Sequence, residues 1–593
     1  IDSVKMGTTV ATNALLERQG EPTLLVTTAG FADVLRIGYQ TRPELFNLDI
    51  VLPEMLYVDV LEVDERLTAH GDVLTPLNEA AARAGLEAAR AKGIESVAIV
   101  LMHGYRYHDH ELRLGAIARE IGFDQVSVSH EVSPLMKIVP RGDTSVVDAY
   151  LSPILGRYVA RMDECLRVDG GAPRLMFMQS NGGLTDAHRF QGKDALLSGP
   201  AGGVVGRART ARAAGFDHLI GFDMGGTSTD VSHFAGDLER CYETEIAGVR
   251  VRAPMIDIHT VAAGGGSILV FDGSRMRVGP ESAGADPGPT CYGNDGPLAV
   301  TDCNVVLGKL RPEFFPKVFG PGGDEPLAVE ATHAKFAALA QEITRATGVE
   351  QSVASIAEGF LSIAVENMAN AIKKISVERG HDVTHYALAC FGGAGGQHAC
   401  LVADRLAIDQ VHIHPMAGVL SALGIGLADI REVFIEAVEA VLTSDLLAEL
   451  TTRWDMMSSA GEKAMLDQGI SPDRIHLVHR IGLRYAGSDT TLHVPAADVD
   501  SVIGSFEEIH LSRFGFISPE KDLIVESVQV EAIGVAQPIE IGKPSGGDGS
   551  AALLGRRTTV MAGIEASTMF LDRAQLAPGQ LIDGPAVLVE PNA

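Results

Sequence analysis

The sequence predicts an α/β fold, and three observations carry that prediction. The chain has 593 residues, more than a single hydrophobic core accommodates, so roughly two to four domains are expected. Its N-terminal third alternates two apolar strand-like runs, at residues 23–27 and 96–102, with a helical pattern over 77–92 that Asn78 caps. Further along, two more apolar strands each run into a glycine-rich turn. Alternation of this kind is typical of sheets that are covered by helices.

The remaining elements follow in order along the chain. Residues 140–142 (PRG) predict a break before a long helix, and residues 198–203 (SGPAGG) predict a turn before a helix that begins at Val204. Residues 354–378 predict a helix that Gly380 closes. Strands are expected at 175–179, 218–224, 386–391, 410–414 and 480–485, helices at 143–167 and 397–406, and β-hairpins from the end of the 218–224 strand to about residue 309.

Composition argues against two classes of partner. The formal net charge of −29 disfavours nonspecific binding to nucleic acid or to an anionic membrane, because both reward a basic face. No run of 18 apolar residues and no signal-type leader is visible. The six cysteines lack C-x-x-C spacing, so reduced thiols and a cytoplasmic location are expected. Because the chain begins at Ile1 and ends in EPNA, we expect a fragment that is cut at both ends.

The strongest local signal is residues 221–230 (GFDMGGTSTD). An apolar strand delivers Asp223 at its end, and Gly225 and Gly226 then allow a tight turn with bare N–H groups. The same turn supplies hydroxyls and a second carboxylate, from Thr227, Ser228, Thr229 and Asp230. Backbone donors suit a nucleotide phosphate, and carboxylates suit a hydrated Mg²⁺. No Gly-Lys-Ser/Thr follows, so this is not a P-loop, and a plain Gly-Gly hairpin turn is the alternative.

The second signal is residues 389–399 (ACFGGAGGQHA), where a strand ends in four glycines and a helix begins. The dinucleotide fingerprint G-x-G-x-x-G fails here, because His398 follows Gly393 and Gly395 where the third glycine belongs. An adenosine contact therefore fits better than a pyrophosphate contact, and close strand–helix packing is the alternative. The residues expected to line the adenosine are Gly392, Gly393, Ala394 and Gly395.

The order of these two loops resembles the actin/Hsp70/sugar-kinase superfamily, a two-lobed RNase H-like ATPase fold. In that superfamily the nucleotide lies between two related α/β lobes, and a first Asp-x-Gly-Gly-Thr loop opens the first lobe. This chain has no such loop near its start, and residues 7–13 (GTTVATN) resemble the stretch that follows it. We therefore expect residues 221–230 to be the second phosphate loop, with the first one missing.

Longer segments resemble the hydantoinase/oxoprolinase family over essentially the whole chain. They are residues 6–18 (MGTTVATNALLER), 198–203, 221–230, 278–289 (VGPESAGADPGP), 291–293 (CYG) and 391–398 (FGGAGGQH). Within that family the chain most resembles the 5-oxoprolinase branch, on residues 61–66 (LEVDER), 138–143 (IVPRGD) and 412–414 (HIH). The resemblance implies a truncated N-terminal lobe at 1–139, an ATP-binding hydantoinase A-type core at 140–430 and a smaller C-terminal accessory α+β region at 431–593.

This resemblance implies an ATP-dependent cyclic amide hydrolase, which opens 5-oxo-L-proline to L-glutamate after phosphorylation of the lactam oxygen. The chain would supply the ATP-binding, phosphorylating half, with ATP and Mg²⁺ as cofactors and K⁺ as an optional further cation. Asp223 is expected to be catalytic and to hold the metal together with Asp230. The expected phosphate contacts are Gly225, Gly226, Thr227 and Thr229.

Three further candidates for catalysis lie outside the two loops. Asp302 and Cys291 lie among glycines and prolines within residues 257–302, which suits side chains on rigid turns, and Cys291 is a candidate nucleophile. A buried thiol in a Pro-Gly turn is the alternative for Cys291. Arg141 is a candidate to clamp a substrate carboxylate, with a solvated arginine that caps the next helix as the alternative.

The same resemblance implies partners. These are a small cyclic amide as substrate, a hydantoinase B-type domain or subunit, and further copies of the chain in a homo-oligomer. Two other functions stay open. One is an N-methylhydantoinase or acetone carboxylase-type subunit, which has the same fold and a different acceptor. The other is a nucleotide-switched binding module without turnover.

Overall fold

A computed structural model describes residues 1–41, 46–167, 173–537, 549 and 552–590. It has mixed α/β architecture, as the alternation of strands and helices predicts. Two compact units emerge, and each is built from separate stretches of the chain. The first unit comprises residues 1–205, 240–256 and 425–538, and the second comprises 206–239, 257–424 and 539–593. The three consecutive regions expected from sequence stay a prediction, because the compact units draw on stretches from more than one of them.

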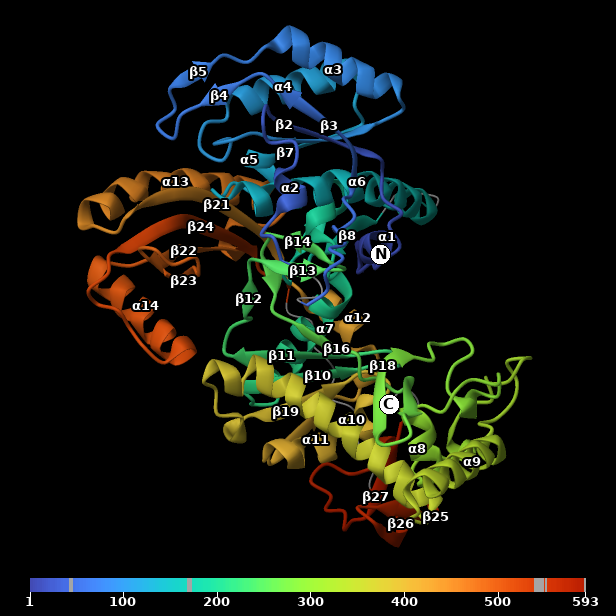
Figure 1. The fold of residues 1–593 in the computed structure, drawn as a ribbon. Coiled ribbons are helices and arrows are strands. Elements are labelled where there is room, and N and C mark those ends of the chain that lie inside the picture. Colours follow the sequence, from blue (N-terminus) through green and yellow to red (C-terminus); the bar gives the residue numbers. More distant parts are fainter. Residues whose placement is uncertain (42–45, 168–172, 538–548, 550–551, 591–593) are drawn as a thin grey trace. The chain divides into compact units, whose positions relative to one another are not determined.

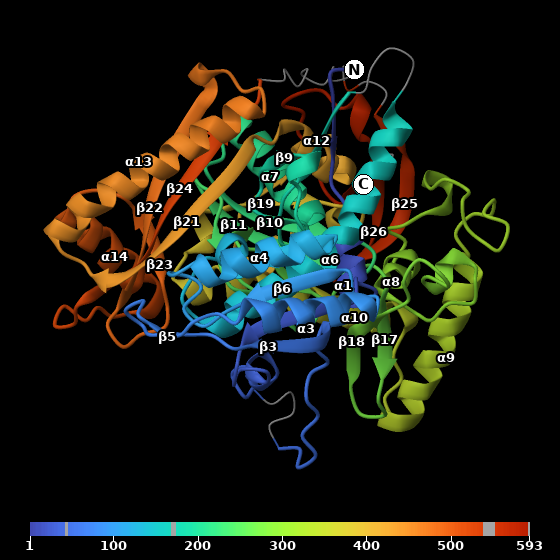
Figure 2. The ribbon, with the colours of Figure 1, turned by 90° about the horizontal axis from the view of Figure 1, so that it is seen from above.

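A four-stranded parallel sheet in the first unit has the order β3-β2-β6-β7. Its strands are β2 (Thr23–Thr28), β3 (Tyr57–Val63), β6 (Ser96–Val100) and β7 (Gln125–Val128). Helices α3 (Glu79–Ala91) and α4 (Asp109–Ile121) lie side by side on one face (Figure 2). Leu24 and Val26 pack toward these helices, and Leu25 between them packs into a second core with the long helix α6 (Ile138–Leu166). The three side chains face alternate sides of the sheet because successive residues of a strand point in opposite directions.

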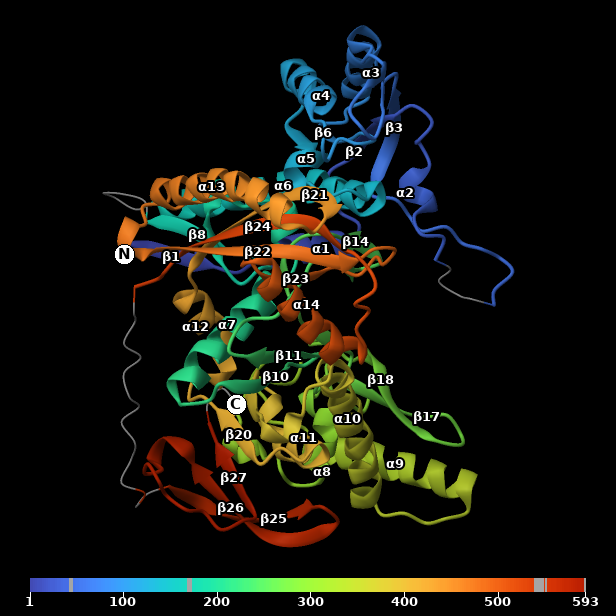
Figure 3. The same ribbon diagram turned by 90° about the vertical axis from the view of Figure 1, so that its left-hand side faces the viewer.

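The other sheet of the first unit has seven strands in the order β1-β8-β9-β21-β24-β22-β23. They are β1 (Ser3–Met6), β8 (Arg174–Met178), β9 (Leu184–Asp186), β21 (Ile430–Val441), β24 (Leu523–Gly534), β22 (Ile475–Tyr485) and β23 (Leu492–Pro495). Figure 3 shows α13 (Ser444–Asp467) lying along β21, β24 and β22. The shorter helix α14 (Val499–Phe514) packs against β23.

Two expected turns are helical instead. The break predicted at residues 140–142 is wrong, because α6 begins at Ile138 and runs through them. Pro140 lies in the first turn of that helix, where its missing N–H would have no intrahelical partner in any case. The turn predicted at residues 198–203 is also wrong, because α7 (Ser198–Ala213) begins there, with Pro200 in its first turn. In both places a proline at a helix start was mistaken for a breaker.

The second unit contains a five-stranded sheet in the order β16-β11-β10-β19-β20. Its strands are β10 (His218–Met224), β11 (Thr229–Ala235), β16 (His259–Val261), β19 (Ala387–Phe391) and β20 (Gln410–Ile413). Strands β10, β19 and β20 are mutually parallel, and β11 and β16 are antiparallel to their neighbours. The main surrounding elements are α8 (Val300–Val306), α9 (Val329–Thr347), α10 (Val353–Ile375), α11 (Ala399–Leu406) and the β17–β18 hairpin (Ser267–Phe271 and Met276–Ser282) (Figure 1). A separate three-stranded sheet comprises β25 (Leu553–Met561), β26 (Ile564–Asp572) and β27 (Ala586–Val589).

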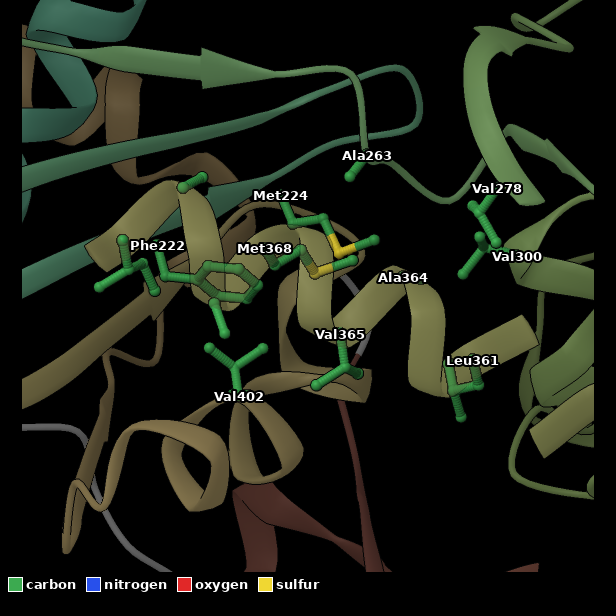
Figure 4. Close-up of a cluster of buried hydrophobic side chains, with 14 of the residues drawn as sticks. Phe222, Met224, Ala263, Val278, Val300, Leu361, Ala364, Val365, Met368 and Val402 are labelled. Carbon is green, nitrogen blue, oxygen red and sulfur yellow. The ribbon is translucent and has the colours of Figure 1, made fainter. Parts of the chain in front are cut away.

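The main core of the second unit fixes the direction of β10. Phe222 and Met224 point from this strand toward Val365 and Met368 of α10, and all four side chains are buried (Figure 4). Burial of one such side chain contributes about 2–3 kcal/mol. Because side chains alternate along a strand, this packing directs Asp223 to the opposite face of the sheet. The core therefore sets the position of the first candidate functional residue.

Over the described part of the chain, no helix combines the length and the hydropathy that crossing a bilayer requires.

Candidate functional site

Asp223 and Asp230 form a pair of neighbouring carboxylates. They are directly opposite each other in the antiparallel pairing of β10 with β11. Burial raises the pKa of Asp223 to about 7, and the negative charge of Asp230 adds to this effect. Burial also raises the pKa of Asp230, although a hydrogen bond from the Thr260 hydroxyl to its carboxylate (2.6 Å) counteracts it. Two neighbouring half-buried acids whose ionised forms are disfavoured by burial are a natural place for a divalent cation.

The turn that follows Asp223 is held by a second glycine run. Gly225 donates its N–H to the Ser228 carbonyl (3.0 Å), which closes the turn. The carbonyls of Gly225 and Gly226 accept hydrogen bonds from the N–H groups of Gly265 (3.1 Å) and Gly266 (2.6 Å). A Cβ on the preceding Gly264 would lie 2.6 Å from the Gly226 carbonyl oxygen. Sequence reasoning missed these glycines, although the run at residues 264–266 (GGG) was a visible signal.

This arrangement leaves backbone donors available. Gly226 and Thr227 are exposed, and among the described residues their N–H groups have no hydrogen-bond partner. The carbonyls of Gly225 and Gly226 accept hydrogen bonds from the second glycine run, which holds the turn while the N–H groups of Gly226 and Thr227 remain accessible. Successive free N–H groups in a tight turn form a concave donor set for an anion such as phosphate.

The second glycine-rich loop lies beside the first. Strand β19 pairs with β10 in parallel, with Phe391 opposite Asp223, so both loops leave the same edge of the sheet. Ala394 donates its N–H to the Met224 carbonyl (3.0 Å). Gly392 has a φ of +82°, and a Cβ there would lie 2.4 Å from Asp223 Oδ1 and 2.5 Å from the Met224 carbonyl oxygen. Only glycine fits at this position, and its absent side chain is what brings the loops together.

Comparison with known proteins identifies the family of the chain. The family model described as "Hydantoinase/oxoprolinase" matches residues 141–433, and "Hydantoinase/oxoprolinase N-terminal region" matches residues 1–122. The chain belongs to the hydantoinase/oxoprolinase family. This confirms the family that the sequence motifs predicted.

The curated relatives include several named 5-oxoprolinase. The chain is 38% identical to 5-oxoprolinase of Dictyostelium discoideum, over all of this chain and 50% of that protein. It is 42% identical to 5-oxoprolinase 1 of Arabidopsis thaliana, over 90% of this chain and 45% of that protein. The chain therefore spans about half the length of these relatives.

Solved structures support the predicted fold class. The crystal structure of ATP-dependent caprolactamase from Pseudomonas jessenii matches with a TM-score of 0.88 and 30% identity, over 100% of this chain and 88% of that one. A nucleotide-free acetone carboxylase structure matches with a TM-score of 0.74 and 21% identity, over 99% and 87% of the two chains, which supports the fold alone. The mixed α/β fold is thus shared with both solved structures.

Thr229 was expected to contact phosphate, but its side chain turns inward. Its side chain is fully buried, and its hydroxyl donates to the Ala263 carbonyl (2.5 Å). Gly395 is likewise buried, and a Cβ there would lie 2.8 Å from the Cys390 sulfur. Both residues hold a loop in shape, whereas Gly226, Thr227 and Gly393 present open surface.

Asp302 and Cys291 belong to the second unit, where they take part in a separate buried hydrogen-bond network. The buried Asp302 carboxylate accepts N–H hydrogen bonds from Thr290 (3.1 Å), Cys291 (2.8 Å) and Ala299 (2.8 Å). Burial and the Asp302 charge raise the pKa of the fully buried Cys291 thiol far above its usual value. A thiol that stays protonated is a poor nucleophile, so this placement does not favour the predicted catalytic role of Cys291. Asp302 ties the 290–299 loop to the start of α8.

Arg141 lies in the first unit, inside α6. Its side chain is fully buried, its guanidinium donates to the carbonyls of Leu101 and Met136, and it faces the Tyr105 ring at 5.6 Å. Burial lowers its pKa. These contacts use the guanidinium for packing, so the geometry gives no support to the predicted substrate clamp or to the solvated alternative.

Proposed function

We propose that this chain is the ATP-binding, lactam-phosphorylating half of a 5-oxoprolinase-type cyclic amide hydrolase, which converts 5-oxo-L-proline to L-glutamate. The observation that carries the proposal is the carboxylate pair of Asp223 and Asp230 beside two glycine-rich turns at one sheet edge. The 38% and 42% identities to proteins named 5-oxoprolinase support the choice of substrate. The match to an ATP-dependent caprolactamase supports ATP as the phosphoryl donor.

Each residue of the sheet edge has a part in this proposal. Asp223 and Asp230 hold Mg²⁺, because their shared burial and repulsion are relieved by a divalent cation. The exposed N–H groups of Gly226 and Thr227 contact phosphate oxygens. Bound ATP supplies the phosphoryl group, and Mg²⁺ neutralises part of its charge. Thr229 holds the turn through Ala263, which assigns it an indirect part.

The adenosine is assigned to the second loop. Gly392 and Ala394 are fixed against Asp223 and Met224, so the backbone of this loop lies close to the metal ligands. Gly393 is exposed, and nothing lies within 4 Å of the position of a Cβ there. A flat, side-chain-free stretch of backbone suits the face of a nucleoside.

The proposed reaction overcomes the low reactivity of an amide. The lactam carbonyl is a poor electrophile, and its nitrogen is a poor leaving group. Transfer of the γ-phosphoryl group to the lactam oxygen forms a P–O bond there as the bond to ADP breaks. Water then adds to the activated carbon, and the ring C–N bond breaks to release the amine and leave an acyl phosphate. A second water hydrolyses this acyl phosphate to the carboxylate and free phosphate. Phosphoryl transfer needs mainly alignment and charge neutralisation, which the two loops are suited to provide.

The rest of the assembly also belongs to this proposal. Because the chain spans about half of the matched 5-oxoprolinases, we assign the completion of hydrolysis to a hydantoinase B-type domain or subunit. We further propose a homo-oligomer in the cytoplasm; a cytoplasmic location is compatible with the absence of disulfides among the described residues. K⁺ is kept as an optional second cation.

Two measurements test the proposal. In the first, the chain of 593 residues is titrated with a fluorescent ATP analogue in the presence and absence of Mg²⁺. We expect the analogue to bind only with Mg²⁺ present, and Asp223→Asn to weaken this binding. Binding that is unaffected by removal of Mg²⁺ and by Asp223→Asn would contradict the proposed site. In the second, ADP release by the chain with its B-type partner is compared across 5-oxoproline, caprolactam, a hydantoin and acetone. Stimulation by 5-oxoproline above the others is expected, and a preference for caprolactam would favour the function of the structural relative instead.

A further inference from the structure

A cluster of metal-binding side chains lies in the second unit, away from the two glycine loops. His233, Glu239 and His381 each offer one ligand atom, and these atoms all lie within 4.8 Å of one another. His233 is opposite Ile220 in the β10–β11 pairing, three residues along the strand from the position of Asp230. That separation is about 10 Å, and the odd spacing puts His233 on the other face of the sheet. We propose that His233, Glu239 and His381 bind a Zn²⁺-like transition-metal ion at a site separate from the proposed nucleotide site.

His233 is already oriented as a ligand. Its Nδ1 lies 2.6 Å from Glu239 Oε1, and its Nε2 lies 2.8 Å from the Tyr386 hydroxyl. A metal on Nδ1 replaces the proton shared with Glu239, and Nε2–H then donates to Tyr386. Metal-bound histidines generally donate their other ring N–H to such a partner, which fixes the ring and its tautomer. The ring is almost fully buried, with 1% of its side chain exposed, so this orientation is held by packing.

Glu239 is also held in place and charged. Burial acts to raise its pKa, but the hydrogen bond from His233 and nearby cationic groups keep the pKa below its usual value. Arg379 lies 3.5 Å from Glu239 Oε2 and makes a shorter contact with Asp257, so Oε1 is left toward the histidines. Glu239 and Asp257 are the residues at which the chain leaves and re-enters the second unit.

His381 is the ligand that has to move. Its Nε2 lies 3.7 Å from Glu239 Oε1, close to the roughly 3.3 Å edge of a tetrahedral site with bonds of about 2.0–2.1 Å. Its ring, however, stacks on that of His233 with centroids 4.0 Å apart and an interplanar angle of 18°. Two parallel rings cannot both direct an in-plane lone pair at one ion, so His381 has to turn out of the stack. Its side chain is 29% exposed, which leaves it room to do so.

The ligand set selects the class of metal. Two imidazoles and one carboxylate suit Zn²⁺ and its Irving–Williams neighbours, whereas Mg²⁺ prefers an all-oxygen shell. Three protein ligands leave a fourth tetrahedral position open, as in sites that keep a water or a substrate. The proposed ion therefore differs in kind from the Mg²⁺ assigned to Asp223 and Asp230.

The test is Zn²⁺ binding to the chain of 593 residues after removal of metals with a chelator, measured by calorimetry, with Co²⁺ absorption as a second readout. We expect one tight site per chain and visible bands of tetrahedral Co²⁺. His381→Ala should weaken Zn²⁺ binding at least tenfold, and Tyr386→Phe about tenfold, as loss of an orienting partner does elsewhere. His385→Ala is the matched control, because His385 is 84% exposed and its recorded ion-pair partner is Asp382.

Two further results decide the matter. Asp223→Asn should leave Zn²⁺ binding unchanged, because Asp223 belongs to the other site. His381→Ala should keep the melting temperature of the metal-free protein, since the side chain is partly exposed, so lost binding is not lost folding. The proposal is overturned if the wild-type chain takes up no stoichiometric Zn²⁺, or if His381→Ala and His385→Ala bind it equally.

Discussion

Replacement of Gly392 by alanine should disrupt the contact between the two glycine-rich loops. The φ of +82° places this residue in the left-handed region, where an alanine costs about 1–2 kcal/mol. Its Cβ would also lie 2.4 Å from Asp223 Oδ1 and 2.5 Å from the Met224 carbonyl oxygen. One of these atoms is main chain, so relief requires a backbone shift, and overpacking of this kind costs a further ~1–3 kcal/mol.

The sum is a loss of about 2–5 kcal/mol of stability in the second unit. For a unit of this size each kcal/mol lowers the melting temperature by roughly 2–4 °C, so a mid-range loss of about 3.5 kcal/mol corresponds to about 7–14 °C. Binding of the fluorescent ATP analogue should weaken as well, because the shift displaces Asp223. Thermal unfolding followed by fluorescence and the nucleotide titration are the two assays.

Gly393→Ala supplies the matched control. Gly393 is the next residue, it has no positive φ, and nothing lies within 4 Å of its Cβ position. Its effect on stability should stay within about 0.5 kcal/mol, as for other open surface positions. Equal melting temperatures for the two variants would refute the reasoning, because that reasoning attributes the whole effect to the contacts at Gly392.

Three other predictions concern Asp223, Asp302 and the cysteines. Asp223 has a folded pKa of about 7, above its ordinary value of 3.8, so the cation-free fold loses stability as the pH rises from about 4 to about 7. Asp223→Asn should therefore raise the melting temperature at pH 8. This gain should shrink toward pH 4, where Asp223 is protonated in both the folded and the unfolded protein. A gain that is independent of pH would contradict this sign. Asp302→Ala leaves the buried N–H donors of Cys291 and Ala299 without an acceptor, whereas the Thr290 N–H keeps the Pro297 carbonyl (3.0 Å). A loss of at least ~2 kcal/mol in urea unfolding is expected, and little change would count against a structural role for Asp302. The native protein is alkylated and its peptides are analysed by mass spectrometry. The exposed Cys165 and Cys400 should react before the buried Cys291. Early labelling of Cys291 would contradict its assignment as an inert thiol.

Strongly patterned elements were predictable from the sequence. The strand at residues 218–224 was predicted with the bounds that the structure gives β10, because an apolar run ends there at a Gly-Gly turn. Asn78 was predicted to cap a helix, and its side chain accepts a hydrogen bond from the N–H of Ala81. Local chemistry decides both features. The prolines at positions 140 and 200 were misread because the same residue ends a helix or begins one, depending on backbone that lies before it.

The sequence predicted the two loops of the candidate site but not their contact in the fold. The two loops were recognised separately, but their adjacency depends on the parallel pairing of β10 with β19, between residues more than 160 positions apart in sequence. No local pattern encodes that pairing. The second glycine run at 264–266 was overlooked for the same reason, since its purpose becomes visible only when its N–H groups meet the carbonyls of Gly225 and Gly226.

The contrast between Asp223 and Asp302 explains why roles are harder to predict than positions. Both are acidic residues beside glycine-rich segments, and both have a pKa that burial raises. Asp302 is surrounded by three backbone donors, so its charge is already compensated by the fold. Asp223 instead has a second carboxylate as its cross-strand neighbour, and the part of the chain that the structure describes supplies no cation to compensate its charge. A structural carboxylate has its charge compensated by backbone N–H groups, whereas a candidate metal ligand does not. Only the folded structure reveals this difference.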